Sequence, residues 1–164
     1  MTVNYEPGDI FLTHSNTFYG WLIRFGERIR DGKAASAWNH AGVIVDSSGT
    51  TVEAVGRGVV VSHMSAHPHS VVIDAGMTPQ DREQVVSFAK SCVGAEYGYL
   101  DVVSIGFRIL LRHTPTLHTT DSLICSELAA RALEHGGWIC PKLDTSEVMP
   151  SDLAKWFLPR ATHK

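Results

Sequence analysis

The stretch HAGVIVDSSGTTVEAV, residues His40–Val55, decides the fold class. Its two halves are rich in β-branched and apolar residues, and the polar turn Ser47-Ser48-Gly49 separates them, which is the pattern of a β-hairpin. Three other short segments with strand character flank it along the chain: Asp9–Thr13 after a Pro-Gly turn, Gly58–Ser62 and Ser70–Asp74. The first half of the chain therefore predicts mostly strands.

The second half of the chain predicts helices. Thr78 and Pro79 form a helix start, with a capping threonine before a proline at the first helical position, and this helix should end near Gly94. We expect further helices at Phe18–Phe25, Tyr99–Leu111, Asp121/Ser122–Glu134 and Ser151–Phe157, the last of them stopping before Pro159. Because strands and helices are segregated along the chain, the sequence predicts an α+β fold, with an antiparallel sheet packed against helices.

Length and composition predict a single globular domain over residues 1–164. Hydrophobic residues make up 44% of the chain and charged residues 19%, which is typical of globular proteins. The formal net charge is only -3, from 14 basic and 17 acidic residues. This near balance gives no electrostatic basis for binding nucleic acid.

The three cysteines, Cys92, Cys125 and Cys140, are widely spaced and form no CxxC pair, so neither a structural zinc site nor a thioredoxin-type motif is indicated. The N-terminal residues MTVNYEPGD lack the pattern of a signal peptide, and no apolar run approaches the roughly 20 residues that span a bilayer. We therefore expect a cytoplasmic protein with no transmembrane segment, although a phage-encoded protein or a secreted effector would look the same. No cofactor is indicated, and the oligomeric state is open.

Cys125 is the residue best placed for chemistry. If Ser122 caps the helix, Cys125 lies in its first turn, where the helix dipole and free backbone N–H groups favour a thiolate. The same N–H groups could hold an oxyanion beside the sulfur. The alternative is a buried structural cysteine, which is what we expect of Cys92 and Cys140.

His40 and Glu53 are the candidate partners of this thiol. His40 opens an apolar strand, which would hold a general base rigidly. Glu53 lies in an otherwise apolar returning strand, where a carboxylate needs either solvent or a partner. If the hairpin pairs residues whose numbers sum to 95 or 97, the two side chains are diagonal neighbours on one face of the sheet. Glu53 would then orient the imidazole, as the third member of a catalytic triad does.

Other histidines give weaker signals. His63, His67 and His69 are close in sequence, as metal ligands can be, but Pro68 intervenes and no helix is expected there. This spacing does not favour a zinc site, and we expect no metal.

Six short motifs follow one another along the chain: Pro7–Ile10, Trp38–Val43, Val52–Ala54, Gly94–Tyr97, Ile124–Leu128 and Met149–Leu153. In this order the chain resembles the circularly permuted branch of the NlpC-type papain-like hydrolases, the group that contains YiiX- and YebB-like proteins. The standard branch has the cysteine first, then the histidine and a polar residue. Here the histidine and the polar residue come first, so the resemblance implies a circularly permuted papain-like fold.

The resemblance also implies residue roles. Cys125 matches the nucleophile, His40 the base and Glu53 the third polar residue. Tyr97, in the family's Gly-x-x-Tyr motif, would flank the cysteine and donate a hydrogen bond to the oxyanion or substrate, unless it is a packed aromatic residue at the start of a helix. The implied activity is amide hydrolysis through an acyl-enzyme, with peptidoglycan-type peptides as the first substrate class, as for an endopeptidase or amidase.

Two other functions stay open. Related permuted proteins act on acyl chains, so a lipid acylhydrolase, thioesterase or acyltransferase is the first alternative, with the apolar segment Tyr99–Leu111 beside a lipid-binding cleft. The second is a binding module without catalysis, against which the joint presence of Cys125, His40 and Glu53 argues. In the enzymatic cases the partner is a small peptide or acyl substrate.

Overall fold

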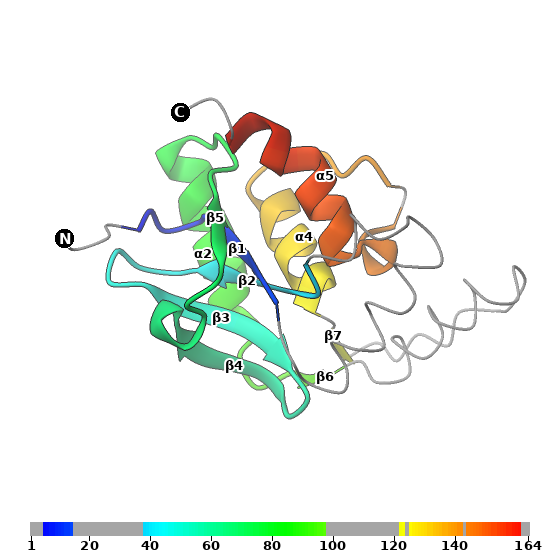
Figure 1. The fold of residues 1–164 in the computed structure, drawn as a ribbon. Helices are drawn as coiled ribbons and strands as arrows, with labels where there is room; N and C mark the ends of the chain where they lie inside the picture. Colours follow the sequence, from blue (N-terminus) through cyan, green and yellow to red (C-terminus); the bar gives the residue numbers. More distant parts are fainter. Residues whose placement is uncertain (1–4, 15–37, 98–121, 124, 143, 162–164) are drawn as a thin grey trace, which may run out of the picture.

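The computed structural model describes residues 5–14, 38–97, 122–123, 125–142 and 144–161. The helices predicted at Phe18–Phe25 and Tyr99–Leu111 lie outside these residues. The described part is an α+β structure in which a five-stranded antiparallel sheet packs against helices (Figure 1). The predicted fold class is therefore confirmed at this level.

The sheet has the strand order β4-β3-β2-β1-β5. Its strands are β1 (Ile10–Thr13), β2 (His40–Ile44), β3 (Thr50–Val55), β4 (Gly58–His63) and β5 (Val71–Ile73). A second sheet pairs two short strands in parallel, β6 (Glu96–Tyr97) and β7 (Ser122–Leu123). The helices are α2 (Pro79–Ser91), α4 (Cys125–His135) and α5 (Pro150–Ala161), with short 3-10 turns η2 (Met64–Ala66) and η3 (Thr145–Glu147).

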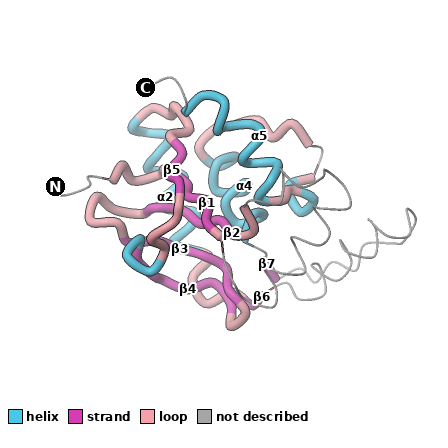
Figure 2. Tube along the Cα trace, viewed as in Figure 1, coloured by secondary structure: helices cyan, strands magenta, loops and turns pink. Residues whose placement is uncertain are grey.

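The two faces of the five-stranded sheet are covered differently. One face contributes Ile10, Leu12, Ala41 and Val43 to the main core, together with buried residues of all three helices. Figure 2 shows α4 and α5 lying together beside the strands, while α2 passes behind the strands in this view. The other face carries a smaller cluster centred on Phe11, with Ile44 and Met64. Strand alternation assigns His40 and Gly42 to this second face.

The five strands of the larger sheet and helix α2 lie where the sequence predicts them, to within one residue at most ends. The hairpin His40–Val55 is present as β2 and β3, and α2 begins after Thr78, whose side chain accepts a hydrogen bond from the backbone N–H of Asp81. Asp81 bonds back to Thr78 and completes a capping box. Gly94 follows the helix with a φ of 94°, a conformation that glycine adopts without strain.

Two predicted helix boundaries are wrong. Ser122 is not a helix cap, because it forms β7 with Leu123 and pairs with Glu96, so α4 begins only at Cys125. This pairing is a long-range contact that local capping preferences do not reveal. Helix α5 also continues through Pro159 to Ala161. A proline so near the end of a helix removes only one intrahelical hydrogen bond.

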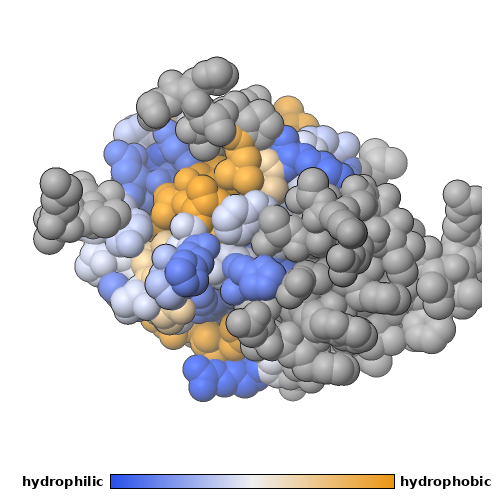
Figure 3. All heavy atoms as spheres, viewed as in Figure 1, coloured by the Kyte–Doolittle hydropathy of each residue, from blue (hydrophilic) through white to orange (hydrophobic). Residues whose placement is uncertain are grey.

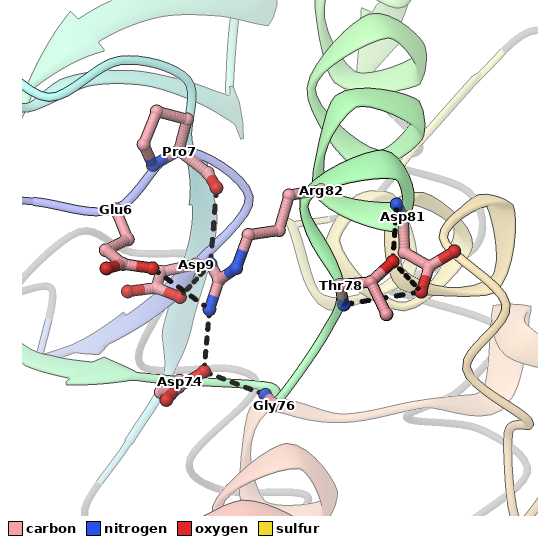
Figure 4. Close-up of polar contacts among 8 residues, drawn as sticks. All are labelled: Glu6, Pro7, Asp9, Asp74, Gly76, Thr78, Asp81 and Arg82. Atoms are coloured by element: carbon pink, nitrogen blue, oxygen red, sulfur yellow. Dashed lines mark hydrogen bonds and ion pairs between the residues drawn. The ribbon is translucent and has the colours of Figure 1, made fainter.

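The motif Pro7-Gly8-Asp9 forms a clamp with Arg82 of α2 (Figure 4). The Arg82 guanidinium donates to Asp9 Oδ1 at 2.6 Å, to the Pro7 carbonyl at 3.2 Å and to Asp74 Oδ1 at 2.7 Å. Gly8 has a φ of 90°, and a Cβ there would lie 2.9 Å from the Cβ of Arg82. The motif therefore joins the start of β1 to α2 and to the end of β5.

Strand β5 is one edge of the sheet. Hydrophobic residues gather over it in the centre of the face shown in Figure 3, and Val71 and Val72 are half-buried.

Among the described residues, none of the helices has the length and hydrophobicity needed to cross a membrane.

Candidate active site

Cys125 is the first residue of α4, and its side chain is buried. The first N–H groups of an α-helix have no intrahelical acceptor and carry partial positive charge, so a sulfur there faces a favourable field for negative charge. The next residue fixes this turn, because the buried Ser126 hydroxyl donates to the Val148 carbonyl at 2.6 Å. The start of α4 is thereby tied to the segment that leads into α5.

The side chain of His40 has two hydrogen-bond partners, Glu53 and Cys125. Nε2 lies 2.5 Å from Glu53 Oε2, and the side chain is also hydrogen-bonded to Cys125. Because Nε2 faces the carboxylate, Nδ1 is the nitrogen left for the thiol. The imidazole therefore lies between a thiol and a carboxylate, with His40 itself 8% exposed.

The contact with Glu53 follows from the hairpin register. Val43 pairs with Val52 and Ile44 with Thr51, so paired numbers sum to 95, one of the two registers expected. His40 and Glu53 are then diagonal neighbours on one face. Gly42 lies opposite Glu53 in this register and leaves room, since a Cβ there would lie 2.5 Å from the Phe11 ring and 3.1 Å from the Glu53 Cβ.

The electrostatics favour a protonated imidazole at His40 beside an ionised Glu53. Burial by itself would lower the pKa of His40, but its hydrogen bonds to Cys125 and Glu53, with the charges of those groups, outweigh burial and raise the pKa to about 10. Burial would raise the pKa of Glu53, but the hydrogen bonds from His40 and His67 hold that pKa well below its usual range. At neutral pH His40 is therefore protonated and Glu53 ionised.

His67 is a member of this cluster that sequence reasoning missed. Its Nε2 lies 3.1 Å from Glu53 Oε1, the carboxylate oxygen that His40 does not contact. It lies in the loop after η2, where the chain folds back over the second face of the sheet. The sequence predicts no helical turn at Met64–Ala66, so nothing in the local pattern brings His67 to Glu53. His63 and His69, grouped with it in sequence, are both exposed.

The cluster also bears on metal binding. One ligand atom each from His40, Glu53 and His67 lies within 4.8 Å of the other two, and two histidines with one glutamate are a known zinc ligand set. However, His40 Nε2 and Glu53 Oε2 are 2.5 Å apart, whereas two ligands on a tetrahedral zinc at ordinary bond lengths lie roughly 3.3 Å apart. The nitrogen points at the oxygen, so this geometry is that of a direct hydrogen bond.

Tyr97 is placed only through its backbone. It lies in β6 and pairs with Leu123 of β7, two residues before Cys125. Tyr97 is therefore a strand residue, and its backbone lies near that of the cysteine in the fold. Its side chain is outside the described part of the structure, so its predicted hydrogen bond to oxyanion or substrate stays a prediction.

The other two cysteines lie apart from the cluster. Cys92 caps the end of α2, and Cys140 precedes Pro141; both are half-buried and unpaired by disulfides. Burial raises the pKa of both thiols. Both are therefore poor thiolates at neutral pH.

In comparisons with known proteins, no family model matches the chain, and no curated protein matches its sequence. The function is therefore inferred from the geometry of four residues, Cys125, His40, Glu53 and His67.

Proposed function

We propose that the protein is a cysteine hydrolase in which Cys125 is the nucleophile, His40 the general acid and base, and Glu53 the group that orients and charges the imidazole. The observation that carries the proposal is the double contact of His40, which bonds the Cys125 thiol on one side and Glu53 on the other. A thiol, an imidazole and a third polar group in this order form a nucleophile–base–orienter chain.

The reaction follows from these positions. The Cys125 thiolate attacks the substrate carbonyl carbon, and the first-turn N–H groups of α4 face the oxygen that becomes negative. The imidazolium of His40 gives its proton to the leaving amine as the carbon–nitrogen bond breaks, which leaves a thioester on Cys125. Water then attacks the thioester while His40 takes a proton from it, and the acid product leaves with the thiolate and imidazolium restored.

The same residues support a finer proposal about the fold. The histidine and glutamate lie on adjacent antiparallel strands, β2 and β3, and the cysteine begins a helix that packs against these strands. In the chain the cysteine comes last. We assign the architecture to the circularly permuted papain-like class, as the sequence motifs imply, with Tyr97 beside the oxyanion.

The substrate class is an amide, and peptidoglycan-type peptides are the first candidates, as the sequence resemblance implies. Esters and thioesters react with a cysteine nucleophile through the same acyl-enzyme, so the experiment must separate them. Muropeptides, a short-chain acyl thioester and phospholipid vesicles would each be incubated with wild type, Cys125→Ala and His40→Ala. We expect peptide cleavage by wild type and a loss of about a thousandfold or more in both variants.

The test of the nucleophile itself needs no substrate. Iodoacetamide, chosen because it is small enough for a buried thiol, would be reacted with the folded protein from pH 5 to pH 9, and each cysteine would be mapped by peptide mass. We expect Cys125 to react faster than Cys92 and Cys140 below pH 8, and this advantage to disappear in His40→Ala. Slow and equal labelling of all three cysteines would support a binding module and refute the hydrolase.

A further inference from the structure

His67 is held firmly beside Glu53. Its backbone N–H donates to the Met64 carbonyl at 2.9 Å, and its own carbonyl accepts from the N–H and hydroxyl of Ser70 at 3.1 and 2.8 Å. Its ring packs on Phe11, with ring centroids 4.8 Å apart. The side chain is 15% exposed. The loop therefore presents a fixed N–H to the carboxylate.

Glu53 needs such a donor. Its side chain is 4% exposed, so water reaches it poorly, and each oxygen of a buried carboxylate is costly without a hydrogen-bond partner. His40 satisfies Oε2 and His67 satisfies Oε1. With both oxygens engaged, the carboxylate plane is fixed and the ionised form is favoured. With one donor removed, the group could rotate away from His40 or take up a proton.

We propose that His67 is a positioning residue of the active site, whose ring N–H holds Oε1 of Glu53 so that Oε2 stays ionised against His40. The chain of contacts then has four members, running from His67 through Glu53 and His40 to Cys125. This inference rests on the proposed hydrolase function, since it assigns His67 an effect on Cys125 that passes through two other side chains.

The structure offers matched variants for a test. His67→Phe keeps an aromatic ring against Phe11 and removes the N–H donor. His67→Gln places an amide N–H near the position of Nε2 and so restores the donor without the ring. His69→Phe makes the same change at an exposed histidine two residues away and is the control. If His67→Phe does not fold, His67→Met, which is flexible and has no donor, takes its place beside His67→Gln.

The readout is the rate of Cys125 alkylation by iodoacetamide as a function of pH, with thermal unfolding recorded for every variant. We expect His67→Phe to react about tenfold more slowly than wild type at pH 7, the effect of losing one hydrogen bond to a buried charge, and its profile to move toward alkaline pH. His67→Gln should stay within about threefold of wild type, because its donor is retained. His69→Phe should match wild type.

Three results would overturn the proposal. An unchanged pH profile in His67→Phe would mean that Glu53 needs no second donor. Equal losses in His67→Phe and His67→Gln, with equally lowered melting temperatures, would reduce His67 to a packing role. A wild-type rate that falls with EDTA and returns with Zn²⁺ would make the cluster a metal site. Failure of the proposed hydrolase function is visible separately. If Cys125 were alkylated at the same rate in wild type and in His40→Ala, that function would be refuted, and the role of His67 with it.

Discussion

His40 differs from His63, another histidine of the sheet, in the hydrogen-bond partners of its ring. The exposed His63 bonds a serine hydroxyl and a backbone carbonyl, which are neutral partners. His40 is buried and bonds a thiol and a carboxylate, both of which can carry negative charge. Burial opposes a charged imidazole, but the hydrogen bonds and charges of these two partners outweigh burial and favour the protonated ring. The reactivity proposed for Cys125 therefore depends on Glu53, which the cysteine does not have to touch.

The ionisation of Glu53 gives a prediction about acid stability. The folded pKa lies below the unfolded reference of 4.5, so as the pH falls through 4.5 the unfolded chain binds a proton that the folded chain does not. The stabilisation is therefore present above pH 4.5 and is lost below it, by up to about 1.4 kcal/mol per pH unit. In Glu53→Gln this loss is absent, so the difference in unfolding free energy between wild type and the variant should shrink from pH 6 to pH 3 in urea titrations.

The control for this prediction is Glu83→Gln, which removes an exposed carboxylate from α2. Its difference from wild type should change little over the same range. If the difference in unfolding free energy between wild type and Glu53→Gln stayed constant down to pH 3, that result would contradict an ionised Glu53 with two hydrogen-bond partners.

Among the secondary-structure elements, the site depends on a position in β2 that has no side chain. Along β2, Gly42 follows His40 by two residues and so points to the same face. The absence of a side chain there lets the Phe11 ring of β1 lie across the strand, where it contacts both His40 and His67. One glycine therefore allows three strands and the loop after η2 to converge on Glu53.

Gly42→Ala should disturb this convergence. The new Cβ would lie 2.5 Å from Phe11 and 3.1 Å from Glu53, so both side chains must shift. We expect a loss of about 2 kcal/mol in unfolding free energy, as is typical of overpacking, together with slower alkylation of Cys125 at pH 7. Leu133→Ala weakens the core near the end of α4, eight residues after Cys125, and serves as the control, because it should lower stability and leave the Cys125 rate unchanged. Equal rates of Cys125 alkylation in wild type and Gly42→Ala would show that the site does not need a glycine at position 42.

At the scale of the whole molecule, the clamp of Arg82 joins parts that are far apart in sequence. Arg82 on α2 binds Asp9 before β1 and Asp74 after β5 (Figure 4). The Asp9 side chain is only 8% exposed, and burial raises its pKa even though Arg82 opposes that change. Arg82 thus joins the first sheet strand, the edge strand and a covering helix, through a buried pair with Asp9 and a half-exposed pair with Asp74.

Replacing Arg82 should therefore destabilise the fold as a whole. Arg82→Met keeps the aliphatic stem but leaves Asp9 buried without its counter-charge, and we expect a loss of about 3 kcal/mol in unfolding free energy by urea titration. Adding Asp9→Asn to this variant should recover part of the loss, since the uncompensated charge is removed. Arg57→Met, at an exposed turn, should have little effect. If Arg82→Met had the same unfolding free energy as wild type, the clamp would not be needed for stability.

Features that depend on local physics could be predicted from the sequence alone. Alternating and apolar runs with a Ser-Gly turn give the hairpin of β2 and β3, and a threonine before proline gives the start of α2. Because strand side chains alternate with a period of two, the pairing of His40 with Glu53 could be predicted once a register was assumed. The motifs in their order suggested Cys125 as the partner of both.

The remaining features arise from contacts that form only in the folded chain. The pairing of β6 with β7 moved the start of α4 from Ser122 to Cys125, and the turn of η2 brought His67 to Glu53. Both are contacts between segments distant in the chain, so no local preference encodes them. The ionisation of His40 and Glu53 belongs to the same class, since a pKa inside a fold depends on burial and on neighbours that only the folded chain assembles.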